Sequence, residues 1–193
     1  MSRRYGPLWV AGTAALGALA AVFDLAFWAF KVKIPFPIFP RLKFDLDGIP
    51  VILALLMYGT SSSVAVSVIL FLVISFRDPL SGFMKGLAEV STALGMALLY
   101  NRGFKGARIL SILSGVALRV SVMTLGNFLV LPAASILSAE AVSGILPFIA
   151  WFNATAGIIS TLGGWLIYIE LARRIPLSLG RTQPKPGERG GSE

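Results

Sequence analysis

Long runs of apolar residues, separated by short polar or proline-containing segments, form the main pattern of this chain. They predict six helices, at residues 8–30, 48–58, 64–76, 80–100, 109–131 and 145–171. The hydrocarbon core of a bilayer takes about 20 helical residues, so the longer runs are long enough to span a membrane. The second and third runs are shorter, and we expect them to thin the bilayer locally, tilt little or extend into flanking residues.

The segments between the runs carry clear breaks. Prolines punctuate the connector 31–43, and the small polar run 59–63 predicts a tight turn. The first run lacks an obvious cleavage site, so we expect a retained helix rather than a signal peptide. Two regions result: a six-helix transmembrane substrate-binding domain at 1–175, and a disordered cytoplasmic tail at 176–193, rich in Gly, Pro and charge.

Composition supports the same class. Of 193 residues, 56% are hydrophobic and 13% charged, and the mean hydropathy is +0.81. A soluble domain could not bury so much apolar surface, so the prediction is an all-α, multi-pass protein of the cell membrane. The chain has no Cys and no His, which excludes disulfides, thiol chemistry and His-ligated metals. The net charge of +8 fits basic loops that set membrane topology, and we expect no nucleic-acid partner.

The basic residues also predict an orientation. With six spans, three basic groups fall on one side, which should be cytoplasmic together with both termini: positions 3 and 4, positions 102, 105 and 108, and positions 173, 174 and 181. The first connector contradicts this rule, because it places Lys31, Lys33, Arg41 and Lys43 on the outer side. We interpret it as an external basic loop that faces an incoming solute.

Two carboxylates, Asp45 and Asp47, stand where the connector meets the second run, next to Phe44. Spanning a bilayer does not require them there, so they are candidate binding residues. The alternative is structural, because Asp47 could cap the helix with Pro50 in its first turn.

The fifth and sixth runs each carry an asparagine in the outer half. Asn127 and Asn153 each offer two donors and an acceptor, which suits the edge of a planar heterocycle with alternating carbonyl and N–H groups. Polar and aromatic neighbours could complete such a pocket, among them Thr124, Phe148 and Phe152. The alternative for each asparagine is a hydrogen bond that packs one helix on another.

Glu89 is a further candidate, inside the fourth run. It could accept hydrogen bonds from ligand hydroxyls, or it could pair with Lys85 or Arg119.

Three motifs in order carry a family resemblance: Phe-Asp-x-x-x-Ile-Pro at 44–50, Met-Thr-x-x-Asn-Phe at 123–128 with Leu-Pro following, and Pro-Phe, then Phe-Asn, before Gly157. Over residues 8–172 the chain resembles the substrate-binding S components of energy-coupling factor (ECF) transporters, most closely the riboflavin-specific members. The resemblance implies capture of a vitamin from outside, with riboflavin as the expected ligand and no cofactor. The basic connector residues could also favour a phosphorylated flavin such as FMN by charge attraction. The resemblance also implies a transmembrane coupling subunit and two cytoplasmic ATPases as partners, so the chain itself is not expected to be an enzyme. A Walker-type phosphate loop is indeed missing from the sequence.

Individual positions follow the family unevenly. Asn127 and Asn153 match the positions that contact the flavin ring in riboflavin members. Ala156 stands where those members usually carry Lys, and Glu89 where they tend to carry Asn. Their usual junction has Ser-Asp where this chain has Asp47-Gly48, so the second acid is displaced by one position.

Small residues line one face of the first predicted helix. Ala11 with Ala15, and Ala14 with Ala18, form small-xxx-small pairs that let another helix approach closely. In the family such an alanine face contacts the coupling subunit. The alternative is packing within the chain's own bundle.

Other functions stay open from the sequence. The ligand could be another vitamin or a heterocycle precursor, which Ala156 favours. An intramembrane enzyme would use Asp45, Asp47 and Glu89 as acid and base, although two carboxylates two residues apart would face different sides of a helix. An assembly protein without a ligand is a further alternative.

Overall fold

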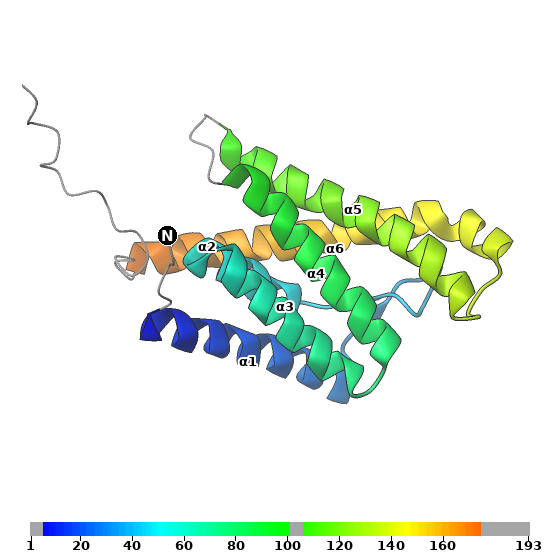
Figure 1. Cartoon of the computed structure of the whole chain (residues 1–193), viewed down its shortest axis with the longest axis horizontal. Helices are drawn as coiled ribbons and strands as arrows, with labels where there is room; N and C mark the ends of the chain where they lie inside the picture. Colours follow the sequence, from blue (N-terminus) through cyan, green and yellow to red (C-terminus); the bar gives the residue numbers. More distant parts are fainter. Residues whose placement is uncertain (1–5, 101–105, 175–193) are drawn as a thin grey trace, which may run out of the picture.

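The computed structural model describes residues 6–100 and 106–174, and these form a bundle of six α-helices (Figure 1). The helices are α1 (Pro7–Ala29), α2 (Gly48–Tyr58), α3 (Thr60–Ser75), α4 (Pro79–Tyr100), α5 (Ala107–Ala133) and α6 (Ala139–Arg174). A short antiparallel hairpin, β1 (Ile34–Pro35) with β2 (Lys43–Phe44), lies in the connector between α1 and α2. The all-α, six-helix prediction therefore holds for the described residues.

The helix bounds agree closely with the apolar runs, with two differences. The predicted turn at 59–63 shrinks to Gly59, whose φ of +91° suits glycine, and Thr60 already begins α3. Helix α6 begins at Ala139, six residues before its apolar run, because Ser138 Oγ accepts the Ala141 amide hydrogen and caps the first turn. Pro147 is accommodated inside this helix.

Helix α2 occupies the centre of the bundle. It packs on α1, α3 and α6, and eight of its eleven residues are buried. A helix that is apolar on every side fits such a buried position. Helices α4 and α5 approach each other very closely. A Cβ placed on Gly95 would lie 2.6 Å from the Ser114 carbonyl oxygen, so glycine is required at this contact.

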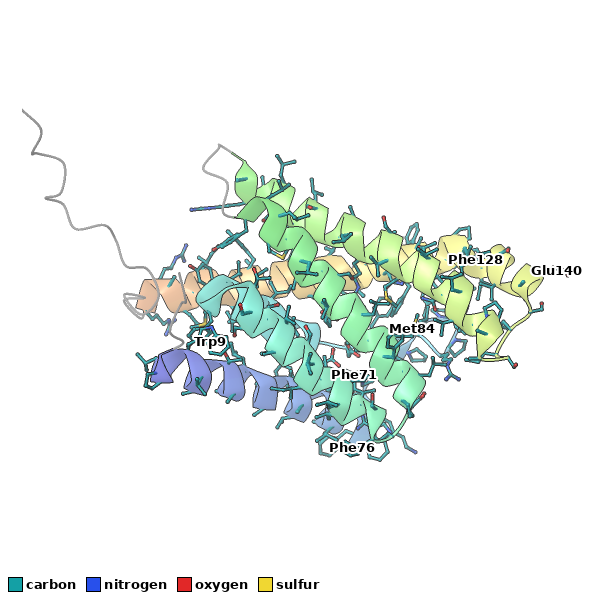
Figure 2. All side chains as sticks on the ribbon, in the orientation of Figure 1. Trp9, Phe71, Phe76, Met84, Phe128 and Glu140 are labelled. Atoms are coloured by element: carbon teal, nitrogen blue, oxygen red, sulfur yellow. The ribbon has the colours of Figure 1, made fainter. Side chains whose placement is uncertain are left out.

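The two ends of the bundle differ in the segments they carry. The starts of α1 and α5 and the end of α6 lie at one end, and the hairpin connector and the turns α3–α4 and α5–α6 lie at the other (Figure 1). Trp9 and Glu140 mark these opposite ends in Figure 2. Of the described helices, α1, α5 and α6 are long and apolar enough to cross a membrane. Large apolar side chains on the outer surface, such as Trp151 and Leu166, would then face lipid.

Several sequence-based expectations fall outside the described residues. These are the basic positions 3, 4, 102, 105 and 181 and the disordered tail at 176–193.

Candidate ligand-binding site

A cavity of about 310 Å³ opens at the connector end of the bundle. Its walls come from the connector, the connector ends of α1 and α3, one face of α4, and the stretches 119–131 of α5 and 152–160 of α6. This volume lies at the lower end of the range of small-molecule sites, roughly 300–1,000 Å³. Apolar side chains such as Met84 and Leu131 alternate with polar ones on the wall, and Met84 on α4 is labelled in Figure 2.

The connector forms an ordered cover over the cavity. Its hairpin pairs Ile34 with Phe44, and the Phe44 ring lies 4.6 Å from the ring of Phe152 on α6. Phe36 is buried against the same Phe152 ring at 5.6 Å. Arg41 then reaches the α3–α4 turn, where its Nη2 lies 3.4 Å from Asp78 Oδ2. The connector is thus attached to α6 by aromatic packing and to the α3–α4 turn by an ion pair.

The two asparagines both lie on the cavity wall. Asn127 on α5 is 2% exposed and Asn153 on α6 is 1% exposed. Each Nδ2 donates to the carbonyl oxygen one turn earlier in its own helix, Asn127 to Met123 at 2.7 Å and Asn153 to Ile149 at 2.9 Å. One amide hydrogen and the side-chain oxygen of each residue remain for a ligand.

Eight ionisable side chains, four acidic and four basic, form a continuous chain of ion pairs beside the cavity. It begins on α1, where Asp24 is fully buried and pairs with Arg77 and with Lys33, the latter at 2.5 Å. Lys33 Nζ also lies 3.3 Å from Asp45 Oδ2, so the connector is bound to α1 through a shared lysine. Because Lys33 and Arg41 are both paired with acids, the connector carries less free positive charge than its sequence suggests.

The chain of ion pairs continues across α4 to α5. Lys85 Nζ lies 2.6 Å from Asp45 Oδ1 and 3.2 Å from Glu89 Oε1. Glu89 in turn accepts a hydrogen bond from Arg119 Nη1 at 2.9 Å. Both pairings foreseen for Glu89, with Lys85 and with Arg119, are therefore present. Glu89 is fully buried among them.

Asp45 and Asp47 have opposite electrostatic environments. Burial alone would raise the pKa of Asp45, but Lys85 and Lys33 outweigh it and hold that pKa well below its usual range. Burial raises the pKa of Asp47 well above its usual range, and the neighbouring Asp45 carboxylate raises it further. Lys85 Nζ lies 2.6 Å from Asp47 Oδ1, and Lys33 Nζ lies 3.9 Å from Asp47 Oδ2. Asp47 occupies the N-cap position of α2 but makes no capping bond.

These directions predict different results for two isosteric substitutions. The ionised Asp45 adds stability that is present above the ordinary carboxyl pKa and is lost as the pH falls through its folded pKa. Folding favours the protonated form of Asp47, so its ionisation costs stability as the pH rises above the ordinary value. At neutral pH we expect Asp45→Asn to lower the thermal unfolding midpoint in detergent and Asp47→Asn to leave it unchanged or raise it. Equal destabilisation by both variants would contradict this assignment.

The predicted site residues lie at different positions relative to the cavity. Asp45, Asn127, Phe152 and Asn153 come together on the cavity wall. Phe44, Asp47 and Glu89 lie behind that wall, in contact with residues that line it.

Two further predicted residues do not line the cavity. Thr124 lies outside the lining, although its buried Oγ1 has no hydrogen-bond partner among the described residues. Phe148 also lies outside the lining and is 43% exposed.

Sequence reasoning missed part of the site. Neither Asp24 nor Arg77 was predicted to be a site residue, yet they pair with each other and line the cavity. A carboxylate inside an otherwise apolar span was the available signal, since such a group must find a partner or a cavity.

In fold the chain is similar to the S component of a bacterial ECF transporter, with a TM-score of 0.73, 25% sequence identity, and coverage of 86% of this chain and 96% of that one. In sequence it is similar to the riboflavin transporter FmnP of Bacillus subtilis (strain 168), at 29% identity over 176 residues that cover 81% of this chain and 90% of the relative. No family model matches the chain.

Both comparisons confirm the resemblance inferred from the three motifs. The chain is an integral membrane protein with the helical-bundle fold of an ECF S component. Both similar proteins are transport proteins, which favours the transport class over the intramembrane enzyme. Among the described residues, no cluster of acidic residues could hold a metal ion.

Proposed function

We propose that this protein is the vitamin-binding S subunit of an ECF-type importer and that its ligand is riboflavin or a related flavin. The observation that carries the proposal is the pair of buried asparagines, one on α5 and one on α6, on the wall of a single cavity. The similarity to a riboflavin transporter supports the choice of ligand.

The free groups of the asparagines suit a flavin. Each side chain keeps one donor and one acceptor, and the dione edge of a flavin ring presents carbonyl acceptors and an N–H donor. Phe152 and Met84 offer apolar surface to the flat ring. The ring system of riboflavin is uncharged and flat, and its dimethylbenzene side is apolar, so burial of that side in such a cavity is favoured by the hydrophobic effect.

The cavity is proposed to open outward. It lies at the connector end of the bundle, opposite the starts of α1 and α5 and the end of α6 (Figure 1). The basic residues Arg108, Arg173 and Arg174 lie at that opposite end, which the positive-inside rule assigns to the cytoplasm. The connector would then cover the site from outside, as the entry route of a vitamin requires.

A phosphorylated flavin such as FMN is a second candidate ligand. Arg41 and Lys43 line the mouth of the cavity, and both are exposed to solvent. A phosphate at the mouth could approach these cations while the ring lies deeper. Riboflavin and FMN would thus share the ring site and differ only at the mouth.

The exposed alanine face of α1 is the proposed contact with a transmembrane coupling subunit, and ATP hydrolysis would take place in separate cytoplasmic ATPases. Ala11, Ala14, Ala15 and Ala18 are all exposed, and Gly17 and Ala20 face the bundle instead. This arrangement leaves the small-xxx-small face free for a partner helix, contrary to the alternative of internal packing.

Uptake of riboflavin by a host that lacks its own importer tests both parts of the proposal. With a coupling subunit and ATPases co-expressed, the wild type should restore uptake. Replacing Ala14 and Ala15 by leucine should abolish uptake but leave riboflavin binding to the purified protein unchanged, because these side chains lie far from the cavity. The matched control is Ala141→Leu, an equally exposed alanine on α6. Uptake unaffected by the α1 substitutions would contradict the partner face.

A further inference from the structure

Arg119 on α5 is a buried cation at the inner end of the cavity. It is 2% exposed and lines the same cavity as Asn127, eight residues later on the same helix. At 1.5 Å per residue, the backbone of Arg119 lies roughly 12 Å deeper than that of Asn127 along the helix axis. The long arginine side chain shortens this separation, since its Cδ lies beside Gly157, one helical turn from Asn153 on α6. A charged side chain this deep in a membrane bundle is expensive unless it is paired or faces a ligand.

Only part of its hydrogen-bonding capacity is used by the protein. Nη1 donates to Glu89 Oε1 at 2.9 Å and to Thr92 Oγ1 at 3.3 Å. Among the described residues, Nε has no hydrogen-bond partner. A guanidinium carries five N–H donors in a fixed fork, and a buried donor left unsatisfied keeps the free-energy cost of its lost hydration. An acceptor supplied by a ligand would remove this cost.

The residues around Arg119 hold its stem against α6 and add no competing polar group. A Cβ placed on Gly157 of α6 would lie 3.1 Å from Arg119 Cδ, so the missing side chain allows the arginine stem to lie against α6. Ala156 also lines the cavity and contributes no polar group that could compete with Arg119. Glu89 and Thr92 hold one edge of the fork from α4, so the guanidinium is oriented before a ligand arrives.

The orientation of a flavin in this cavity follows from solvation. The hydroxylated chain is favoured at the open mouth, where water reaches Arg41 and Lys43, and the flat ring is favoured in the interior. The polar groups at the inner end then meet the polar edge of the ring.

We propose that Arg119 is a specificity-determining residue that donates a hydrogen bond to a ring carbonyl oxygen of the bound flavin. This inference rests on the proposed function and adds a residue to it. Glu89 acts through Arg119 as a positioning residue. A planar heterocycle without a carbonyl at this edge would leave the Arg119 donor unpaired and would bind less tightly.

Riboflavin analogues in which a ring carbonyl oxygen is replaced by sulfur, a weaker acceptor, test the contact in the full chain. We expect the wild-type protein to prefer riboflavin over at least one of the two thio-analogues by about 10- to 100-fold, the value of a hydrogen bond from a charged donor. Arg119→Lys keeps the positive charge beside Glu89 but loses the fork. In this variant riboflavin should still bind, but the ratio of its affinity to that of the thio-analogue should fall to nearly 1.

A second variant guards against misfolding of Arg119→Lys. Gly157→Ala places a methyl group against the arginine stem and should reduce the same preference by displacing the guanidinium. If the wild type binds riboflavin, but Arg119→Lys and Gly157→Ala both keep the full preference for riboflavin over its thio-analogues, the role of Arg119 is overturned and the proposed function is not. A wild type that binds no flavin would overturn the proposed function first.

Discussion

Replacing Asn153 with alanine is expected to weaken riboflavin binding by roughly 10- to 100-fold, and Asn127→Ala should have a similar effect. Each asparagine is buried on the cavity wall with one donor and one acceptor available to the ligand. Alanine removes both groups and leaves the ring edge of the ligand unpaired in a desolvated site, at about 1–3 kcal/mol. Titration of the purified protein by quenching of riboflavin fluorescence measures the change.

The control must separate ligand contact from helix stability, since each asparagine also bonds a carbonyl in its own helix. Ser143 on α6 makes the same kind of bond, from Oγ to the Ala139 carbonyl oxygen at 2.9 Å, but it is exposed and outside the cavity lining. Ser143→Ala should leave riboflavin affinity unchanged. If Asn127→Ala and Asn153→Ala bound riboflavin as tightly as Ser143→Ala, the asparagine pair would not be the recognition site.

The largest loss of stability is expected for Glu89→Ala. Glu89 is fully buried and pairs with Arg119 and Lys85, so its removal leaves a buried guanidinium without its carboxylate. Breaking a buried ion pair from one side costs about 3–5 kcal/mol in soluble proteins. The free energy of unfolding in mixed micelles should fall by an amount of this order. The measurement is a denaturant titration followed by circular dichroism.

Two control variants test the predicted loss of stability in Glu89→Ala. Glu170 pairs with Arg174 at 2.6 Å on the exposed surface of the same bundle, so Glu170→Ala should cost about 0–1 kcal/mol. Replacing Glu89 and Arg119 together by leucine should restore much of the stability lost in Glu89→Ala, because no unpaired charge remains. A Glu89→Ala variant as stable as Glu170→Ala would show that the buried pair is not a structural element.

Most helix bounds could be predicted from the ends of the apolar runs, because helices in this bundle must be apolar wherever they pack or face lipid. Helix α2 was predicted residue for residue, since Asp47 and Gly59 interrupt the apolar run at its two ends. The start of α6 was not, because Gly144 and Pro147 weaken the helical pattern while the Ser138 cap extends the helix.

The polar residues of the site were predictable, but their pairing was predictable only in part: the pairing of Glu89 with Lys85 or Arg119 was foreseen, and that of Asp24 with Arg77 was not. Asn127 and Asn153 stood out because an amide in hydrocarbon needs a partner. The pairing of Asp24 with Arg77 joins residues 53 positions apart, and no local pattern encodes such a contact. Phe148 shows another limit, because the helical period places it one turn before Phe152 on the same face, yet it lies outside the cavity lining and is 43% exposed.

The most direct test is the visible absorption spectrum of the protein purified in detergent from a host supplied with riboflavin. Our account predicts the bands of an oxidised flavin at close to one flavin per chain, with much less flavin retained by the variant that combines Asn127→Ala and Asn153→Ala. A colourless, folded protein that also fails to quench the fluorescence of added riboflavin would contradict the assignment of a flavin ligand.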